Sequence, residues 1–265
     1  MTAARSARRR LVAITHLPSP SMQDGERTFA GDDIVDAALA LEQHAAYRSA
    51  LEQCGAAVAV LSANRAMPDC VFVEDTALVL DEVAIMMSPG AVSRRGEPAG
   101  IEPALRPYRE IAYVALPATI DGGDIVRAGR SLYVGASART SGDGIAALRE
   151  IVTRFGYSVT GVPVEKCLHL KSACSALADG RFLVNAEWID VAPLPASALI
   201  SVPDDEPCAG DVLVIGEHII SSDAFPRTAD LLRSTGAEVI PVSVSEFAKV
   251  DGGVTCLSLV FDAEW

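Results

Sequence analysis

Positive charge is scarce in this sequence. Lysine and arginine total 22 residues against 35 aspartates and glutamates, which gives a formal net charge of −13. An acidic protein repels phosphate backbones, so nucleic acid is not expected as a partner. Long hydrophobic runs are missing as well, because no segment approaches the roughly 20 apolar residues that span a bilayer. We therefore expect no membrane insertion.

Several motifs that mark common enzyme classes are also absent. The chain has no Walker phosphate loop, no Gly-X-Gly-X-X-Gly between a strand and a helix, and no Gly-X-Ser-X-Gly elbow. Nucleotide binding and serine hydrolysis therefore lack their usual marks. Paired zinc-ligand spacing is missing too, although Cys167, His169 and nearby acids leave a mixed metal site as an alternative. We expect neither a metal nor another cofactor.

Cysteine is present but sparse. The six cysteines are scattered and lack the density of a secreted domain held together by disulfides. The apolar segment 11–14 is too short to be the core of a signal peptide. Both features predict a protein of the reducing cytoplasm.

The most abundant pattern in the sequence is a hairpin, in which a short polar or glycine turn joins two apolar runs. The hairpins recur at intervals of about 40 to 50 residues, which is typical of repeat architectures. Asp-Gly and Gly-X pairs favour such two-residue turns. Four turns are predicted, at residues 81–82, 129–130, 179–180 and 216–217.

Helical patterns follow these hairpins. Apolar spacing predicts a helix over residues 145–155 that stops at Gly156, and a second helix from Pro226 to the residue before Gly236. A long helix is predicted over residues 33–54. The helix after the first hairpin is weaker because Pro107 interrupts it, and the third unit has only a short candidate over residues 192–198.

The repeating unit is therefore a hairpin, a helix and a strand. The expected additional strands cover residues 11–14, 56–61, 157–164, 238–240 and 256–261. With the pieces at both ends, this gives about five α/β units. Since no linker or change in composition divides the chain, we expect a single domain over residues 1–265.

One long segment, residues 17–31, has no regular pattern. Its prolines, serines and glycine resist regular structure. A loop of this length is either disordered or a functional lid, and the sequence leaves both alternatives open.

Cys256 is the strongest candidate for a nucleophile. It follows Gly252 and Gly253, which allow a ligand to approach the backbone, and it is expected to begin a strand. The other five cysteines have simpler interpretations as packing residues. His169 precedes the third hairpin, and a histidine can supply the proton transfer that a thiol nucleophile requires.

Acidic residues flank two short segments. Asp69, Glu74 and Asp75 border the expected strand 70–73, and Asp121 and Asp124 border a glycine pair. If these strand ends converge on one mouth, the carboxylates form a site for a metal or for a cationic ligand. The simpler alternative for each Asp-Gly turn is a solvated surface loop.

Six ordered motifs together resemble the dimethylarginine dimethylaminohydrolase family, and the match covers nearly the whole chain. The motifs are PDCVFVED at 68–75, SRR at 93–95, DGGD at 121–124, GASART at 135–140, LHLKS at 168–172 and DGGVTC at 251–256. The resemblance implies the pentein fold, a five-fold pseudosymmetric α/β propeller of ββαβ units around a central channel. It also implies a hydrolase that acts on a small methylated arginine.

The resemblance assigns a role to each candidate residue. Cys256 would attack the guanidinium carbon, while His169 acts as general acid and base, and Asp121 completes the catalytic set. In the resemblance, Asp75 and Asp121 contact the guanidinium nitrogens of the substrate, and Asp69 binds its amino end. Arg94 and Arg139 bind the substrate carboxylate. Glu74 and Asp251 support these substrate-binding residues. Because position 121 is Glu in some relatives, its reach affects the expected preference for methylation state.

Other penteins provide the alternatives. Arginine deiminases use similar Cys, His and acid chemistry, but they are usually longer and have an inserted helical segment; arginine amidinotransferases are longer too. Some penteins are binding proteins without catalytic activity, because a fold alone does not make an enzyme. The Cys, His and acid set favours catalysis here. A homodimer is a further expectation.

Overall fold

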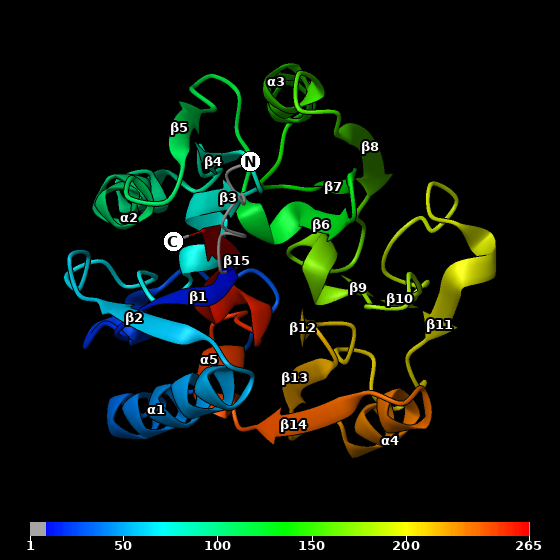
Figure 1. Cartoon of the computed structure of the whole chain (residues 1–265). Helices are drawn as coiled ribbons and strands as arrows, with labels where there is room; N and C mark the ends of the chain where they lie inside the picture. The colour runs from blue at the N-terminus through cyan, green and yellow to red at the C-terminus, as the bar shows by residue number, and fades with distance from the viewer. Residues whose placement is uncertain (1–8, 265) are drawn as a thin grey trace, which may run out of the picture.

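The structure, a computed structural model, describes residues 9–264. Within this range the strands form five three-stranded sheets, arranged around a common axis (Figure 1). In each sheet the first two strands are antiparallel and the third strand is parallel to the second. This is the repeating unit that the sequence predicts, and the count of five is confirmed.

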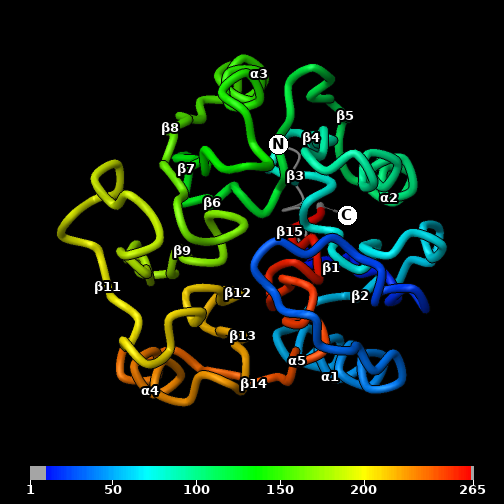
Figure 2. The backbone as a smooth tube through the Cα atoms, turned by 180° about the vertical axis from the view of Figure 1, so that it is seen from behind, coloured from blue at the N-terminus to red at the C-terminus, as the bar shows by residue number. Residues whose placement is uncertain are grey.

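The strands of the five sheets follow one another along the chain. The bounds are β3 (Ala77–Val79), β4 (Val83–Met86) and β5 (Glu110–Tyr113); β6 (Ile125–Ala128), β7 (Ser131–Ala136) and β8 (Ser158–Pro163); β9 (Cys174–Ala176), β10 (Phe182–Val184) and β11 (Leu199–Ser201); β12 (Val212–Ile215), β13 (His218–Ser222) and β14 (Glu238–Val242); and β15 (Leu259–Glu264), β1 (Arg9–His16) and β2 (Ala57–Leu61). The fifth sheet joins segments from opposite ends of the described chain, which lie side by side in both views (Figures 1 and 2).

All four predicted hairpins are confirmed. Their turns separate β3 from β4, β6 from β7, β9 from β10 and β12 from β13. Gly129, Gly180 and Gly216 have φ angles of 60°, 84° and 59°. A side chain is strained in this left-handed region, which is why glycine occupies these turns.

Helices connect the second and third strands and lie at the outer rim (Figures 1 and 2). They are α1 (Ala37–Gln53) in the fifth sheet, α2 (Glu97–Leu105) in the first, α3 (Gly142–Thr153) in the second and α4 (Pro226–Ser234) in the fourth, while the short α5 (Ser245–Ala248) precedes the last strand. The third unit has only a 3-10 turn, η6 (Ala196–Ala198). The helix candidate at 192–198 was therefore wrong, because Pro193 and Pro195 cannot donate the backbone hydrogen bonds of an α-helix.

Several element boundaries also differ from the sequence predictions, and two of the largest shifts have a local cause. The long helix begins at Ala37 instead of residue 33, because the Asp36 carboxylate caps it by accepting from Ala38 N at 2.9 Å and Leu39 N at 3.1 Å. Its stop at residue 53 is close to expectation, since Gly55 follows with a φ of 85°. The final strand begins at Leu259 instead of Cys256, because residues 255–257 form a 3-10 turn.

Five of the nine candidate site residues lie on, or directly before, 3-10 turns that precede the first strands of four sheets; they are Glu74, Asp75, Asp121, His169 and Cys256. These turns are η2 (Val73–Thr76), η4 (Gly122–Asp124), η5 (Leu170–Ser172) and η7 (Thr255–Leu257). Residues 70–73 therefore form no strand, contrary to the prediction. The first strands β3, β6, β9, β12 and β15 lie closest to the axis in Figure 1. Five-fold repetition thus carries side chains from distant motifs to one place.

The segment 17–31 is ordered, and it contains a 3-10 turn, η1 (Met22–Asp24). Met22 is only 1% exposed and belongs to a hydrophobic cluster with Tyr47 of α1 and Phe247 of α5. Burial of this side chain fixes one end of the loop to the core. Of the two alternatives for this loop, disorder is therefore excluded.

None of the helices in residues 9–264 is long and apolar enough to span a bilayer.

Candidate active site

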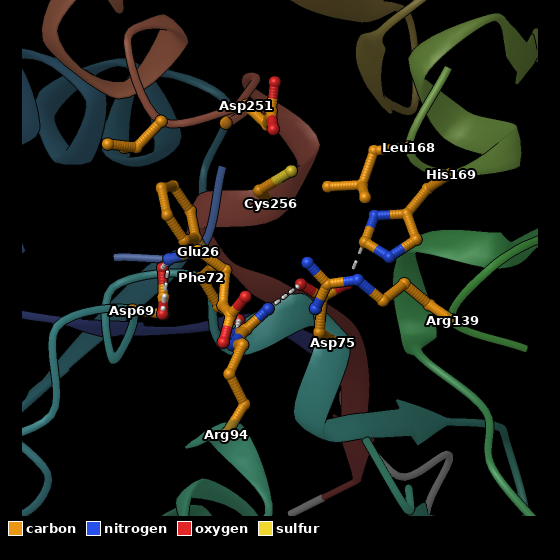
Figure 3. Close-up of a pocket in the computed structure, with 12 residues that line it drawn as sticks. Glu26, Asp69, Phe72, Asp75, Arg94, Arg139, Leu168, His169, Asp251 and Cys256 are labelled. Carbon is orange, nitrogen blue, oxygen red and sulfur yellow. Dashed lines mark hydrogen bonds and ion pairs between the residues drawn. The ribbon is translucent and has the colours of Figure 1, made fainter. Parts of the chain in front are cut away.

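A pocket beside the axis gathers most of the predicted residues (Figure 3). Seven of the nine line it: Asp69, Asp75, Arg94, Arg139, His169, Asp251 and Cys256. The sulfur of Cys256, the imidazole of His169 and the guanidinium of Arg139 face the same space. Asp121 and Glu74 are not among its lining residues.

His169 stands at the start of η5 and is 4% exposed. Its Nε2 lies 3.1 Å from Asp121 Oδ2, and its Nδ1 lies 3.8 Å from Asp75 Oδ1. Burial lowers the pKa of this imidazole, but Asp75, the hydrogen bond to Asp121 and Asp124 outweigh it and raise the pKa to about 9. His169 is therefore protonated at neutral pH and can donate a proton within the pocket.

Asp121 is fully buried behind the histidine. Its Oδ1 accepts from Gly90 N at 2.9 Å, while its Oδ2 faces His169. Asp124, three residues later, accepts from Leu170 N at 2.9 Å and so fixes the turn that follows the histidine. Both acids therefore hold the imidazole in place.

Steric crowding explains why glycine occupies both central positions of the DGGD motif. A Cβ at Gly122 would collide with the carbonyl oxygen of Glu74. A Cβ at Gly123 would lie 2.7 Å from both Asp75 Oδ1 and His169 Nδ1. Only glycine lets the η4 backbone approach these groups so closely, and Gly123 N donates to Asp75 Oδ1 at 3.0 Å.

Asp75 is held by Arg94. Arg94 Nη1 donates to Asp75 Oδ2 at 2.5 Å, and its other nitrogens bond Glu97 and the carbonyl oxygen of Phe72. Burial raises the pKa of Asp75, but His169 and Arg94 outweigh it, so that the pKa is lowered overall. Asp75 is therefore a carboxylate at neutral pH.

The two predicted arginines differ in their partners. Arg94 is engaged by Asp75, Glu97 and Phe72. The guanidinium of Arg139, by contrast, makes no hydrogen bond or ion pair with any residue in the range 9–264 and points into the pocket (Figure 3). Arg139 is the better placed of the two to receive a carboxylate from a ligand.

Asp69 lies at the opposite side of the pocket beside Glu26 (Figure 3). Both Asp69 oxygens accept from Glu26 N at 3.2 Å. Burial raises the pKa of Asp69, and the Glu26 charge adds to this, while Arg94 opposes it. The Glu26 carboxylate itself accepts from Ser93 Oγ. This end of the pocket is suited to a cation such as an amino group.

Asp251 joins the loop 17–31 to the segment that carries Cys256. Its carboxylate accepts from the backbone nitrogens of three successive residues, Thr28 at 2.5 Å, Phe29 at 3.0 Å and Ala30 at 2.5 Å. The loop is thereby fixed beside the pocket, which it lines with Glu26 and whose remaining volume is about 20 Å³. This space holds about one water molecule, so a ligand the size of an amino acid requires part of the lining to move.

Cys256 lies in the middle of η7 and is half-buried. Gly253 N lies 3.4 Å from its sulfur. Burial raises the pKa of the thiol well above its ordinary value, and the charges of Asp211, Asp75 and Glu74 raise it further. In this state of the pocket the sulfur is therefore a neutral thiol.

Glu74 is not one of the residues that line the pocket. Lys171 Nζ donates to Glu74 Oε1 at 2.6 Å. The other oxygen, Glu74 Oε2, is buried without a hydrogen-bond partner. Glu74 therefore ties η2 to the segment after His169 instead of lining the pocket.

One group of side chains among residues 9–264 has ligand atoms close enough to hold a metal ion. It consists of Asp75, Asp121 and His169, whose ligand atoms lie within 4.8 Å of one another. Each of these acids also has a donor from the protein, Arg94 in one case and Gly90 in the other. The same geometry therefore also suits proton transfer between an acid and a base.

Five lining residues were not predicted. Three lie inside the quoted motifs, namely Phe72, Leu168 and Gly252, and Val250 directly precedes a motif. Glu26 lies in the irregular loop, where the only available signal was the preceding Gly25: a Cβ there would lie 2.6 Å from Asp69 Oδ1.

Comparison with known proteins identifies the family. No family model matches the chain. The chain is 40% identical over 248 residues to an N(G),N(G)-dimethylarginine dimethylaminohydrolase of Streptomyces coelicolor, covering 93% of this chain and 95% of the relative. It is 36% identical to the protein of the same name from Pseudomonas aeruginosa, covering 94% and 98%. The chain belongs to the dimethylarginine dimethylaminohydrolase family.

A solved structure agrees with this assignment. A cysteine-to-serine variant of the Pseudomonas aeruginosa dimethylarginine dimethylaminohydrolase, complexed with citrulline, superposes with a TM-score of 0.89 at 36% identity, covering 94% of this chain and 98% of that one. The fold is the pentein α/β propeller, as the resemblance predicted, and the protein is a hydrolase that acts on C–N bonds.

Proposed function

We propose that the protein hydrolyses N-ω-methylated arginine, as asymmetric dimethylarginine or monomethylarginine, to citrulline and dimethylamine or methylamine. The observation that carries this proposal is the content of one pocket: a thiol, a protonated histidine, ionised Asp75 and the unpartnered guanidinium of Arg139. The substrate contains a cation at each end and one carboxylate. The charges of the pocket complement this arrangement.

Substrate orientation follows from the charges. Asp75 would receive the guanidinium nitrogens, and charge-assisted hydrogen bonds would fix the guanidinium plane against the sulfur. Asp121 would support this position through His169. Arg139, with Arg94 beside it, would take the α-carboxylate, and Asp69 would take the α-amino group. Because both groups are attached to one carbon, the Arg139 side chain would turn toward Asp69 when substrate binds.

The substrate cation also activates the nucleophile. In the empty pocket, burial and neighbouring acids keep Cys256 protonated. A guanidinium bound between the sulfur and these acids favours the thiolate, because an opposite charge stabilises the ionised form. As the Cys256 thiol loses its proton to solvent, the thiolate forms beside the guanidinium carbon that it attacks.

The reaction proceeds in two halves. The Cys256 thiolate forms a bond to the guanidinium carbon, and the bond from that carbon to the methylated nitrogen breaks as His169 gives this nitrogen its proton. An S-alkylthiouronium intermediate and a free amine result. His169, now neutral, takes a proton from water as the water oxygen attacks the same carbon. The carbon–sulfur bond then breaks while the added hydroxyl group loses its proton to solvent, which releases neutral citrulline and the Cys256 thiolate.

The test is a substrate panel with the purified protein. Asymmetric dimethylarginine should yield equal amounts of dimethylamine and citrulline, and Cys256→Ser should yield neither while retaining the melting temperature. Ammonia and citrulline from arginine alone would show an arginine deiminase instead. Binding of dimethylarginine without turnover would show a binding protein, and complete loss of activity on chelation would show that a metal is required.

A further inference from the structure

Asp211 lies directly before the first strand of the fourth sheet, and site residues lie on the turns before the first strands of the other sheets. The first strand of the fourth sheet is β12, which lies beside the axis (Figure 1). The corresponding turns before β3, β6, β9 and β15 carry the acids, the lysine and the cysteine described above. None of the six motifs includes Asp211, so no role has been assigned to it.

The carboxylate of Asp211 contacts the segment that holds the nucleophile. Asp211 Oδ1 accepts from Thr255 N at 3.4 Å. A Cβ at Gly253 would collide with Asp211 Oδ2, and Gly253 N lies 3.4 Å from Cys256 Sγ. Asp211 therefore supports both residues that fix the position of the sulfur.

The charged and titratable groups around Asp211 come from four elements. Glu74 belongs to η2, Lys171 to η5, Cys256 to η7 and Tyr47 to α1. Glu74 Oε2 and Thr255 Oγ1 are buried there without hydrogen-bond partners. Burial and the Glu74 charge raise the pKa of Asp211 to about 7, against the opposing effects of Thr255 and Lys171. Above pH 7, where Asp211 is ionised, Lys171 alone does not neutralise two carboxylates, so this cluster then holds excess negative charge near the sulfur.

Among the charged groups that raise the pKa of the Cys256 thiol, Asp211 has the largest effect, ahead of Asp75 and Glu74. Asp75 is partly neutralised by Arg94 and Glu74 by Lys171. The structure gives Asp211 no ion pair with any residue in the described range. Its charge therefore acts on the sulfur with the least compensation.

We propose that Asp211 is a positioning residue with an electrostatic function: its carboxylate holds the segment 253–255 under the sulfur, and its charge keeps Cys256 a neutral thiol until a cation enters the pocket. The thiol is thereby protected from alkylation and oxidation in the free protein. The proposal deepens the proposed function, on which it rests only for the identity of the cation. Its test needs no substrate.

The test is alkylation of Cys256 by iodoacetamide between pH 6 and pH 10, compared between the wild-type protein and Asp211→Asn. Asparagine keeps the acceptor for Thr255 N and removes the charge. Removing a neighbouring like charge lowers a pKa by about one unit. The profile of alkylation rate against pH should therefore shift to lower pH by that amount, and the rate at pH 8 should rise about tenfold. Trypsin releases Cys256 in the peptide 250–265, which contains no other cysteine, so mass spectrometry follows this thiol alone.

The matched control is Asp205→Asn. It removes the same unit charge from the same segment, but Asp205 is exposed and pairs with Arg227 at the surface. The profile of Cys256 alkylation rate against pH in Asp205→Asn should equal that of the wild type. The Cys54 peptide, residues 49–65, reports general opening of the fold and should react equally in all three proteins.

If the profile of Cys256 alkylation rate against pH is unchanged in Asp211→Asn, the proposal is overturned. A shift of the same size in Asp205→Asn also overturns it. If Asp211→Asn does not fold, the wild-type profile decides. Ionisation of Asp211 should flatten the rise of the alkylation rate near pH 7, before a second rise toward higher pH; a single uninterrupted rise through pH 7 overturns the coupling. Failure of the proposed function appears separately, as absence of amine release with these alkylation profiles intact.

Discussion

The two sides of the pocket are built differently. One side, which we call the acidic wall, consists of Asp75, Asp121 and His169 with Arg94 behind them, and each of these residues is at most 4% exposed. The other side, the loop wall, consists of the segments 17–31 and 251–256. It is held through half-exposed Asp251 and the backbone of an exposed loop.

This difference determines which side can move. Separating charges within the acidic wall would leave buried groups unpaired, at a cost of several kcal/mol. The loop wall exchanges hydrogen bonds with water when it opens, and each such bond contributes only about 1 kcal/mol net. Because the closed pocket has room for about one water molecule, we expect substrate to enter by displacement of segment 17–31 of the loop wall, while the acidic wall and the segment that carries Cys256 stay fixed.

The largest effect is expected from the catalytic member of the acidic wall. His169→Ala should lower kcat by about 10²- to 10⁴-fold, because the leaving amine loses its proton donor, while KM changes little. Steady-state kinetics on dimethylarginine measure both constants. His218→Ala, at a partly exposed histidine that pairs with Glu238, is the control and should retain activity. A lowered melting temperature that accounts for the lost activity would contradict the catalytic role.

Arg94→Met tests the stability of the same wall. It leaves buried Asp75 and Glu97 without their cation, so the free energy of unfolding should fall by about 3–5 kcal/mol. Urea denaturation measures this change. The control is Arg233→Met, which removes an exposed arginine paired with Asp230 and should not change stability measurably. A loss below about 1 kcal/mol would mean that the wall tolerates unpaired charge.

Asp251→Asn tests the loop wall. Asparagine tolerates the left-handed backbone at this position, where φ is 59°. It weakens the bonds to residues 28–30, so their amides should exchange faster by a factor that corresponds to about 1–3 kcal/mol. Hydrogen exchange followed by mass spectrometry measures this change, with exposed Asp24→Asn in the same loop as the control. Equal protection of these amides in both variants would show that Asp251 does not anchor the loop. If substrate leaves the protection of the wild-type loop unchanged, the loop does not act as a lid.

Asp121→Asn should give the smallest effect. In the wild type, the raised pKa of His169 means that the proton donor is present below about pH 9 and is lost as the pH rises above it. Without the Asp121 charge, the His169 pKa falls, so the alkaline decline of kcat should move to lower pH by about one unit. A pH profile of kcat tests this shift. If the decline of kcat at high pH stays at the same pH, a group other than His169 causes this decline.

Much of the fold was predictable because its turns are marked by local chemistry. The hairpin turns at Gly129, Gly180 and Gly216 need positive φ, and the sequence supplies glycine at each of them. Boundaries were missed where a side chain overrode the pattern, as with the Asp36 cap. The start of the last strand was missed because a 3-10 turn places Cys256 before it, and hydrophobic spacing alone does not distinguish these two conformations.

The site was predictable residue by residue but not in its partners. The motifs pointed to Asp75, His169 and Cys256, all of which line the pocket. They did not indicate that Arg94 would be largely engaged by Asp75 and Glu97 while Arg139 stayed unpartnered. Glu26 and Asp211 were missed because each reaches the site through a contact distant in the sequence, with Asp69 in one case and Thr255 in the other.

The pairing of β1 with β15 has a consequence for biosynthesis. The turn with Cys256 directly precedes β15, the last described strand, and β15 completes its sheet only on β1, the first. Until residues 259–264 have been synthesised, β1 lacks its antiparallel partner and the turn with Cys256 has no strand after it to hold it. The nucleophile therefore takes its final position only when β15 pairs with β1 and completes the fifth sheet.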